Sequence, residues 1–303
     1  MPFIRRSSFE WRLRTRSLAL GERTVVMGVI NVTPDSFSDG GRYRTPAAAV
    51  DGTLAMFEQG AVIVDLGGES TRPGEHEAIG ASEEIDRVVP VIEEVLRHRP
   101  EAILSVDTYK AETAQAALRA GVEIVNDVSG LLWDRALAAV CAEARSGLVL
   151  MHTRGRPQEW RTLPKLAEGQ IVPLVRRELK RQLDAALAAG ILRERIVLDP
   201  GFGFGKIFRE NYELIAGMKE LRTLGQPLLA GVSRKSFLGR TLASIRGGVE
   251  PAAAERGNAS LAAATATILA GADLVRTHEV RPMVEAAAVA DAILAAAAEN
   301  MET

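Results

Sequence analysis

Polar residues follow eight short apolar runs of this sequence, and residues of these types can carry chemistry. Amides donate and accept hydrogen bonds, carboxylates accept them, and arginine, lysine and histidine donate them. One such residue after a strand is usually a cap or a turn former, but eight such places favour a shared site. In chain order the residues are Asn31, Asp65, Asp107, Asn126 with Asp127, His152, Asp199, residues 233–236, and Arg276 with His278.

The clearest of these places is the stretch 27–41, MGVINVTPDSFSDGG, where an apolar run stops at an amide. The run 24–30 predicts a fully buried strand, and Pro34 prevents the strand from continuing because proline has no N–H for the ladder. The residues after Asn31 are rich in Thr, Ser and Asp. We therefore expect a functional loop at the carboxyl end of this first strand.

Elements of two kinds must position these residues, since eight β-type runs alternate with longer amphipathic segments. This alternation indicates βαβ units and a parallel sheet, and eight pairs predict a single (β/α)8 TIM barrel, with its active site at the carboxyl ends of the strands. The alternative, a doubly wound sheet, usually has a glycine-rich dinucleotide loop after its first strand, which residues 31–34 lack. The predicted strands are 24–30, 61–66, 102–106, 122–125, 147–151, 195–198, 227–230 and 272–275, and the predicted helices include 46–60, 82–98, 111–120, 169–189, 211–221 and 253–270.

The chain is predicted to form one catalytic domain. Residues 24–303 make the barrel, and residues 1–23 make a short basic N-terminal extension, either an arm or an edge hairpin. The extension has five arginines in its first 16 residues, but no apolar core or cleavage site of a targeting peptide follows. No long linker rich in Pro, Gly or Ser divides the remainder.

Composition argues against several classes of partner. A net charge of -2 and a pI near 6.2 give no electrostatic reason to expect nucleic acid or an anionic membrane. No apolar segment approaches the roughly 20 residues that span a bilayer. Cys141 is the only cysteine, which excludes intrachain disulfides and thiolate metal clusters. We expect a cytoplasmic protein with small-molecule substrates.

These residues resemble the dihydropteroate synthase family over nearly the whole chain. Members of this family are (β/α)8 barrels of folate biosynthesis, and sulfonamides target them. They join 6-hydroxymethyl-7,8-dihydropterin pyrophosphate to p-aminobenzoate. The resemblance implies a transferase that releases pyrophosphate. Residues 1–23 fall outside the family pattern, and 152–168 and 240–252 match it poorly. The matching motifs are residues 27–41, 65–74 (DLGGESTRPG), 105–108 (SVDT), 126–127 (ND), 151–152 (MH), 198–206 (LDPGFGFGK), 233–236 (SRKS) and 275–280 (VRTHEV).

The resemblance implies a pterin pocket. A pterin ring has amide-like groups and a guanidine-like edge, which need carboxylates and amides in fixed positions. Asp199 is expected at the 2-amino edge and Lys235 on the ring carbonyl side, and Asp107 could alternatively or additionally cap the helix that follows it. Lys206 is predicted to be structural or a solvated charge, outside the site. The expected pterin set is Asp107, Asn126, Met151, Asp199, Gly203 and Lys235.

The resemblance also implies an anion site, since a pyrophosphate leaving group needs concentrated positive charge. Arg72 and Arg276 can bind phosphate oxygens in bidentate fashion. Asn31 is expected to be the metal ligand for a Mg2+ ion whose remaining oxygens come from pyrophosphate and water. The expected set is Asn31, Thr71, Arg72, Arg276 and His278.

The second substrate needs an apolar slot for its ring and donors for its carboxylate. By resemblance, loops 32–41 and 67–80 close over bound pyrophosphate, and Ser236, at a helix N-terminus, donates to the carboxylate. Asp39 is expected to reach the incoming amine. The expected p-aminobenzoate set is Phe37, Thr71, Pro73, Phe204, Lys235 and Ser236.

The family mechanism is dissociative, so the neutral amine attacks a cation and needs no strong base. Asp107 is expected to stabilise the positive charge on the pterin methylene, with Lys235, Arg276 and Asp39 as the other catalytic residues. Two alternatives remain open: a pterin-binding methyltransferase domain that passes a methyl group from methyltetrahydrofolate to a corrinoid protein, and a non-catalytic pterin-binding paralogue. The family also suggests a homodimer.

Overall fold

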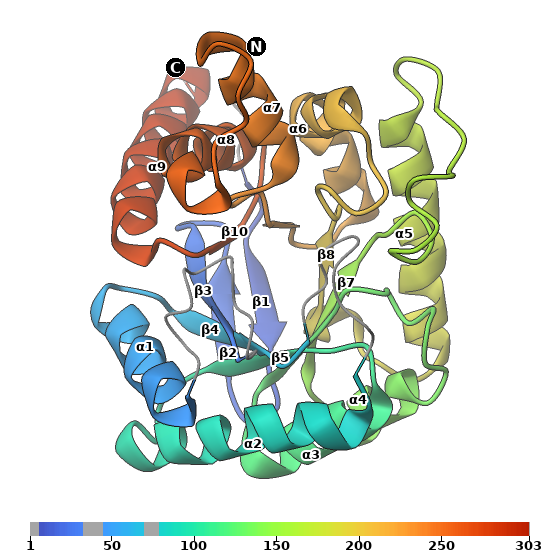
Figure 1. Cartoon of the computed structure of the whole chain (residues 1–303), viewed down its shortest axis with the longest axis vertical. Helices are drawn as coiled ribbons and strands as arrows, with labels where there is room; N and C mark the ends of the chain where they lie inside the picture. The colour runs from blue at the N-terminus through green and yellow to red at the C-terminus, as the bar shows by residue number, and fades with distance from the viewer. Residues whose placement is uncertain (1–5, 33–44, 70–78, 303) are drawn as a thin grey trace.

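Eight parallel strands form a nearly closed barrel in the computed structural model, which describes residues 6–32, 45–69 and 79–302 (Figure 1). The hydrogen-bonded order is β8, β7, β6, β5, β4, β3, β10, β9. A parallel bridge between Leu198 and Leu228 joins the two edges. The predicted single TIM barrel is therefore confirmed. The strands are β3 Val25–Asn31, β4 Ile63–Gly67, β5 Leu104–Asp107, β6 Ile124–Asp127, β7 Gly147–Met151, β8 Ile196–Asp199, β9 Leu229–Ala230 and β10 Leu274–Thr277.

Helices cover the outside of this barrel (Figure 1). They are α1 Pro46–Glu58, α2 Ala81–His98, α3 Ala111–Ala120, α4 Leu137–Ala144, α5 Ile171–Ala188, α6 Phe208–Leu221, α7 Ser236–Ile245, α8 Gly257–Leu269 and α9 Val280–Glu302, with short 3-10 turns at Arg193–Arg195, Arg222–Leu224 and Ala253–Arg256. Among the described residues, none of these helices is both long and apolar enough to cross a membrane.

The main core lies between the strands and the helices. Helix α2 shows how the sequence builds it, since Val88, Val91, Ile92 and Val95 are buried at the spacing of one helical face. The strands are apolar on both faces because helices cover one side and the barrel interior fills the other. This two-sided burial is why the strands could be predicted as continuous apolar runs.

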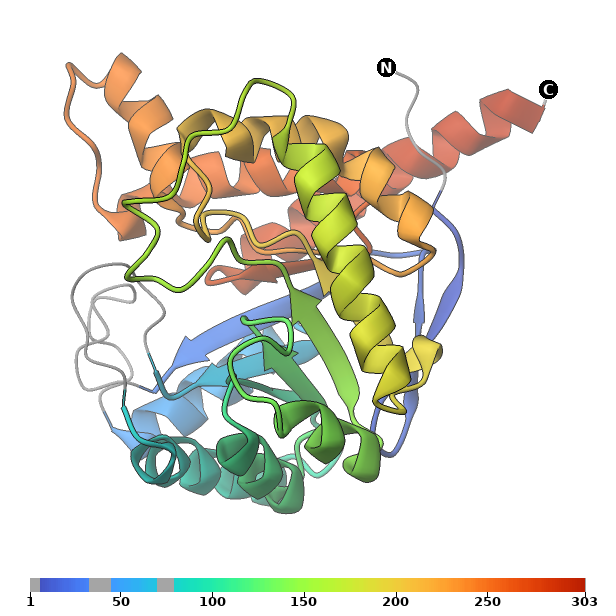
Figure 2. The ribbon, with the colours of Figure 1, turned by 90° about the vertical axis from the view of Figure 1, so that its right-hand side faces the viewer.

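A two-stranded hairpin plugs the amino end of the barrel. Strand β1, Phe9–Arg12, pairs antiparallel with β2, Ser17–Leu20. Trp11, Leu13 and Leu20 are buried in one cluster with residues of the barrel interior such as Met27 and Ile63. Figure 2 shows the hairpin in dark blue on the right, opposite the yellow-green loop between β7 and α5.

The arginines of the extension hold this plug in place. Arg14 Nε donates to Val122 O at 3.0 Å, and Arg16 Nη1 donates to Glu101 O at 2.9 Å. The Arg6 guanidinium pairs with Asp291 on α9 at 2.6 Å. The predicted extension is thus a hairpin whose side chains contribute to the barrel core, while a domain boundary at residue 23 stays a prediction.

All eight predicted strands occur, but most of them begin and end later than predicted. The polar residues Asn31, Asp107, Asp199 and Arg276 belong to the strand ladders and do not follow them. Their side chains are therefore placed by strand register. Helix α4 was not among the predicted helices, and its N-terminus has no side-chain cap to indicate where it begins.

Candidate active site

The register of four neighbouring strands brings polar residues to one end of the barrel. Asn31 on β3 pairs with Gly67 on β4, Gly67 pairs with Asp107 on β5, and Asp107 pairs with Asn126 on β6. A Cβ on Gly67 would lie 3.6 Å from both Asn31 Oδ1 and Asp107 Cβ. Glycine at this position therefore leaves open the space between these two side chains.

A buried ionic cluster lies beside this row. Arg276 on β10 donates from Nε to Asp65 Oδ2 at 2.7 Å and from Nη2 to Asp107 Oδ2 at 2.8 Å. Asn126 Nδ2 donates to the same Asp65 oxygen at 2.8 Å. The Asp65 side chain is fully buried, whereas those of Asp107 and Arg276 are 12% and 21% exposed. Two carboxylates thus share one guanidinium at the carboxyl end of the barrel.

The electrostatics of the cluster leave Asp107 poised between two charge states. Burial raises the pKa of Asp107 to about 7, against the lowering effect of Arg276, and the nearby Asp65 charge raises it further. The same surroundings raise the pKa of Arg276, because the two carboxylates outweigh its desolvation. A carboxyl whose pKa is shifted this far by burial and a specific charge partner is a candidate for chemistry.

The interpretation of Asp107 as a helix cap is wrong. Helix α3 begins at Ala111, whose N–H donates to Asp134 Oδ2 at 2.8 Å, and the N–H of Lys110 donates to Thr108 Oγ1 at 3.2 Å. The carboxylate of Asp107 binds Arg276 instead, and Lys110, the N-cap residue of α3, forms no side-chain cap.

The predicted pterin residues of the other half of the barrel also lie together. Lys235 Nζ is 4.0 Å from the centroid of the Phe204 ring, and a Cβ on Gly203 would lie 3.2 Å from Lys235 Cδ. Met151 packs in the same apolar cluster as Phe204. Burial raises the pKa of Asp199 to about 6, although the N–H of Gly201, 2.7 Å from Asp199 Oδ1, opposes this shift.

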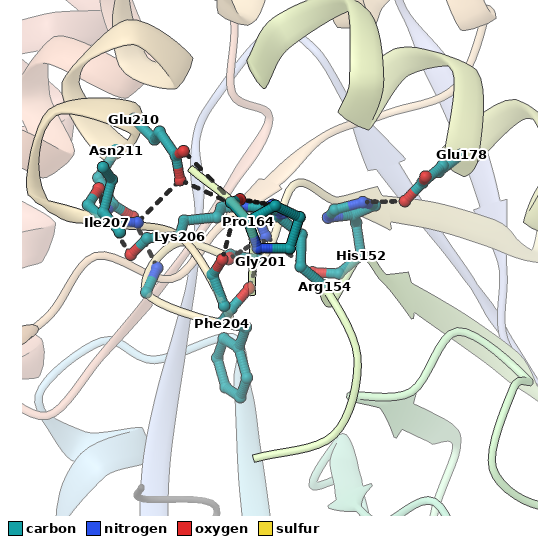
Figure 3. A network of polar contacts seen from close by, with 12 residues as sticks. His152, Arg154, Pro164, Glu178, Gly201, Phe204, Lys206, Ile207, Glu210 and Asn211 are labelled. Carbon is teal, nitrogen blue, oxygen red and sulfur yellow. Dashed lines mark hydrogen bonds and ion pairs between the residues drawn. The ribbon is translucent and has the colours of Figure 1, made fainter. Parts of the chain in front are cut away.

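Lys206 holds the turn that carries Gly203 and Phe204. Its Nζ donates to His152 O at 3.1 Å, Gly201 O at 2.7 Å and Phe204 O at 3.2 Å, as Figure 3 shows. Only 7% of Lys206 is exposed, and this burial lowers its pKa to about 7. Of the two predicted roles, the structural one is confirmed and the solvated charge is wrong.

Positive φ angles explain the alternating glycines of this turn. Gly201 and Gly205 have φ values of 67° and 68°, and a Cβ at Gly201 would lie 1.9 Å from His152 O. Only glycine fits such a conformation at this distance from the backbone. The sequence GFGFGK therefore makes a compact turn after β8 that presents Phe204.

His152 is a buried partner of this turn (Figure 3). Its Nε2 lies 2.8 Å from Glu178 Oε2 on α5, and its side chain is fully buried. Burial lowers the pKa of His152 to about 4, which favours the neutral ring at neutral pH. Of the histidines that follow strands, His152 therefore supports the fold, and His278 is the candidate for substrate contact.

The end of β10 and the start of α7 provide the remaining predicted residues. His278 Nδ1 lies 3.0 Å from Ser233 Oγ. Ser236 is the exposed first residue of α7, and Lys235 is the N-cap of that helix. Arg234, for which no role was predicted, has a φ of 60° and donates to Glu279 Oε1 at 2.9 Å.

The predicted residues Phe37, Asp39, Thr71, Arg72 and Pro73 lie outside the described residues. Asp65 belongs to this site although no role was predicted for it. Its signal in the sequence is a single carboxylate within the otherwise apolar run 61–66.

The described residues do not by themselves make a magnesium site. Groups of three or more His, Cys, Asp or Glu able to hold a metal are absent from residues 6–32, 45–69 and 79–302. The carboxylates of Asp65 and Asp107 are bound to Arg276. Asn31 supplies one amide oxygen, which is too little for Mg2+ unless a ligand provides the other oxygens.

Comparison with known proteins identifies the family of this chain. The model of the family described as "Pterin binding enzyme" matches residues 27–278. A dihydropteroate synthase of Synechocystis is 41% identical over 90% of this chain and 91% of its own, and that of Escherichia coli is 42% identical over 89% and 92%.

Solved structures give the same result for the fold. The structure of Yersinia pestis dihydropteroate synthase with a sulfonamide drug has a TM-score of 0.86 and 37% identity, covering 95% of this chain and all of that one. The enzyme of Xanthomonas albilineans in complex with 7,8-dihydropteroate has a TM-score of 0.77 and 38% identity, covering 91% and 96%.

Proposed function

This chain belongs to the dihydropteroate synthase family of pterin binding enzymes, and we propose that it joins 6-hydroxymethyl-7,8-dihydropterin pyrophosphate to p-aminobenzoate. The products are 7,8-dihydropteroate and pyrophosphate. The observation that carries this function is the cluster of Asp65, Asp107 and Arg276. The cluster places Arg276, which can bind the leaving pyrophosphate, beside the carboxylate of Asp107, which can stabilise the positive charge left on the pterin.

The pterin ring would lie over the carboxyl ends of β5, β6 and β8. Asp199 would accept from the 2-amino edge, Asn126 would bind the amide-like edge, and Lys235 would lie at the ring carbonyl side. Gly203 and Met151 would form the walls. The closeness of Lys235 to Phe204 and Gly203 supports this placement, because pterin pockets need polar groups fixed in an otherwise apolar cavity.

Departure of pyrophosphate is the first chemical step that we propose. The bond between the methylene carbon and its oxygen breaks, and both electrons leave with pyrophosphate. Arg276 and His278 would bind the leaving oxygens, together with Thr71 and Arg72. Asp107 would stabilise the positive charge on the pterin methylene, and such stabilisation lowers the barrier because the charge appears in the transition state.

Attack by the amine completes the reaction. The nitrogen lone pair of p-aminobenzoate forms the new C–N bond, and one N–H proton is released, with Asp39 proposed near that amine. Phe204 with Phe37 and Pro73 would hold the ring, while Ser236, Lys235 and Thr71 would face the carboxylate. A sulfonamide that imitates p-aminobenzoate would compete for this slot.

We propose that Mg2+ binds only together with pyrophosphate. Asn31 would be its one ligand from this chain, and the phosphate and water oxygens would provide the rest. When bound, the ion would neutralise charge on the leaving group. No step above depends on it.

A homodimer in the cytoplasm is the assembly that we propose, with no nucleic acid or membrane partner. Large apolar side chains are exposed at the start of α6 and the end of α7, where Phe208 is 38% and Ile245 is 78% exposed. Burial of such side chains would stabilise a helix-mediated interface. Sedimentation equilibrium of the purified chain should give twice its 32.5 kDa; a monomer at all concentrations would contradict the dimer.

Release of pyrophosphate from the pterin substrate tests the function directly. The assay is run with Mg2+, with and without p-aminobenzoate, and the product is separated by chromatography. We expect dihydropteroate and pyrophosphate in equal amounts. Pterin binding without product would contradict the synthase, and methyl transfer from methyltetrahydrofolate would then be tested.

The rate should fall as the pH drops below about 7. Asp107 must be ionised to stabilise the cation, and its pKa is raised to about 7 mainly by burial, so that protonation removes the active form on the acid side. We expect kcat/KM for the pterin substrate to lose about tenfold per pH unit well below that pKa. The measurement is kcat/KM between about pH 5 and 9.

The control for this profile is Asp107→Asn, whose residual activity should lack the acid limb that Asp107 causes. Ionisation of the pyrophosphate substrate would affect both proteins equally. An identical acid limb in both would show that Asp107 is not the titrating group.

A further inference from the structure

We propose that Asp65 is a positioning residue whose carboxylate fixes the orientations of Arg276 and Asn126 for the pterin pyrophosphate. The inference rests on the proposed function and deepens it, since the family resemblance gave Asp65 no role. Asp65 lies within the barrel, on the amino side of the strand ends that carry the site. It lies two residues before the end of β4 and pairs with Val29 on β3 and Ser105 on β5.

One carboxylate oxygen of Asp65 accepts hydrogen bonds from two side chains. Oδ2 accepts from Arg276 Nε at 2.7 Å and from Asn126 Nδ2 at 2.8 Å. The other oxygen, Oδ1, is buried and has no hydrogen-bond partner among the described residues. A fully buried carboxylate is costly to keep unless its charge has a partner, so the guanidinium of Arg276 accounts for its presence here.

The first consequence concerns the amide of Asn126. An ionised carboxylate only accepts hydrogen bonds, so the group that faces Asp65 must be the NH2 of the amide. The carbonyl oxygen of Asn126 must then face away from Asp65. Asp65 therefore decides that Asn126 presents an acceptor to the N–H groups of the pterin ring.

The second consequence concerns the guanidinium of Arg276. Nε is bound to Asp65 and Nη2 to Asp107, which fixes the plane of the group by two points. Nη1 makes no hydrogen bond within the described part of the chain, so its N–H groups remain for an anion. If Asp65 were absent, Arg276 would rotate about its bond to Asp107 and lose this fixed orientation.

Asparagine at position 65 is a conservative test of this role. Its side-chain oxygen can accept the same two hydrogen bonds, and its NH2 would occupy the place of Oδ1, where no bond is lost. The substitution removes the negative charge. Since charge-assisted hydrogen bonds are about twice as strong as neutral ones, the bonds to Arg276 and Asn126 should weaken. Serine at position 65, which is shorter, removes the geometry as well.

The experiment measures Asp65→Asn and Asp65→Ser against the wild-type protein in the same assay. Misplaced groups in an active site cost on the order of 100-fold. We expect kcat/KM for the pterin substrate to fall about tenfold in Asp65→Asn and about 100-fold in Asp65→Ser. The KM for p-aminobenzoate at saturating pterin substrate should change less than about twofold, because within the described residues Asp65 hydrogen-bonds to Arg276 and Asn126, neither of which is predicted for that ring.

A matched control is Asp273→Asn at the opposite end of the barrel. Asp273 is fully buried, pairs with Arg222 at 3.1 Å, and also has one oxygen without a partner among the described residues. Asp273→Asn should lose thermal stability, as Asp65→Asn does, but it should keep the kinetic constants of the wild-type protein. It separates the loss of a buried charge from the loss of orientation.

Calorimetric binding of the pterin pyrophosphate makes the test independent of turnover. Asp65→Asn should weaken this binding, and in an Arg276→Gln background the difference between the two Asp65 variants should become smaller, because Asp65 acts partly through Arg276. Wild-type kinetics and binding in both Asp65 variants, or equal losses for both substrates, would overturn the inference. An inactive wild-type protein would refute the proposed synthase, while the binding data would still decide the role of Asp65.

Discussion

Asp107→Asn should lower kcat by about 100- to 1,000-fold, while binding of the pterin substrate should weaken only a few-fold. This is the size of effect expected when one preorganised electrostatic group is removed from a site. Asparagine keeps the shape and the acceptor oxygen that faces Arg276 at 2.8 Å. It removes the negative charge, which matters most when the methylene becomes positive. The measurement is kcat together with calorimetric binding of the substrate.

Asp134→Ala is the control for this prediction. Asp134 binds the first N–H of α3, the helix after Asp107, and loss of a cap costs about 0.5–2 kcal/mol of stability. The control should lower the melting temperature and leave kcat unchanged. If Asp107→Asn reduced binding and kcat by equal factors, the charge of Asp107 would have no special role in the transition state.

Arg276→Lys should lower kcat/KM for the pterin substrate by about 100-fold or more, although the positive charge is kept. Arg276 spans Asp65 and Asp107 with two different nitrogens, and only a planar guanidinium can do so and still present N–H groups to an anion. A lysine ammonium would bind one carboxylate or share itself between both. Steady-state kinetics with varied pterin pyrophosphate provides the measurement.

The matched control is Arg222→Lys. Arg222 pairs with Asp273 and donates to Gly271 O at 2.7 Å, far from the carboxyl ends of the strands. It should lose stability without a change in kcat/KM. Unchanged turnover in Arg276→Lys would count against the anion site, whereas an equal kinetic loss in both variants would indicate a general effect of these substitutions.

The barrel could be predicted from sequence because its strands are buried on both faces. Runs such as 24–30 and 147–151 are apolar throughout, and helical segments with 3.6-residue periodicity separate them. The same pattern showed that polar residues lie at the strand ends. The motifs around them indicated the family that the comparisons confirm. The substrate roles of the individual residues stay predictions.

Contacts between distant parts of the chain could not be predicted in this way. Arg276 and Asp65 are 211 positions apart, and nothing in either motif states that they bind each other. From the sequence, Lys206 could be either a structural residue or a solvated charge. Only the tertiary structure shows that its Nζ donates to three backbone carbonyls. The basic extension likewise became a plug because Trp11 and Leu13 meet the open amino end of the barrel.

The sequence by itself therefore determined the order of elements, the end of the barrel at which polar groups collect, and the family. Those properties follow from local periodicity and from short motifs. The tertiary structure decided which carboxylate holds which cation and how far each is buried. Such pairings, and the pKa of Asp107 that follows from them, depend on strand register and closure of the barrel, which bring together residues that the sequence keeps far apart.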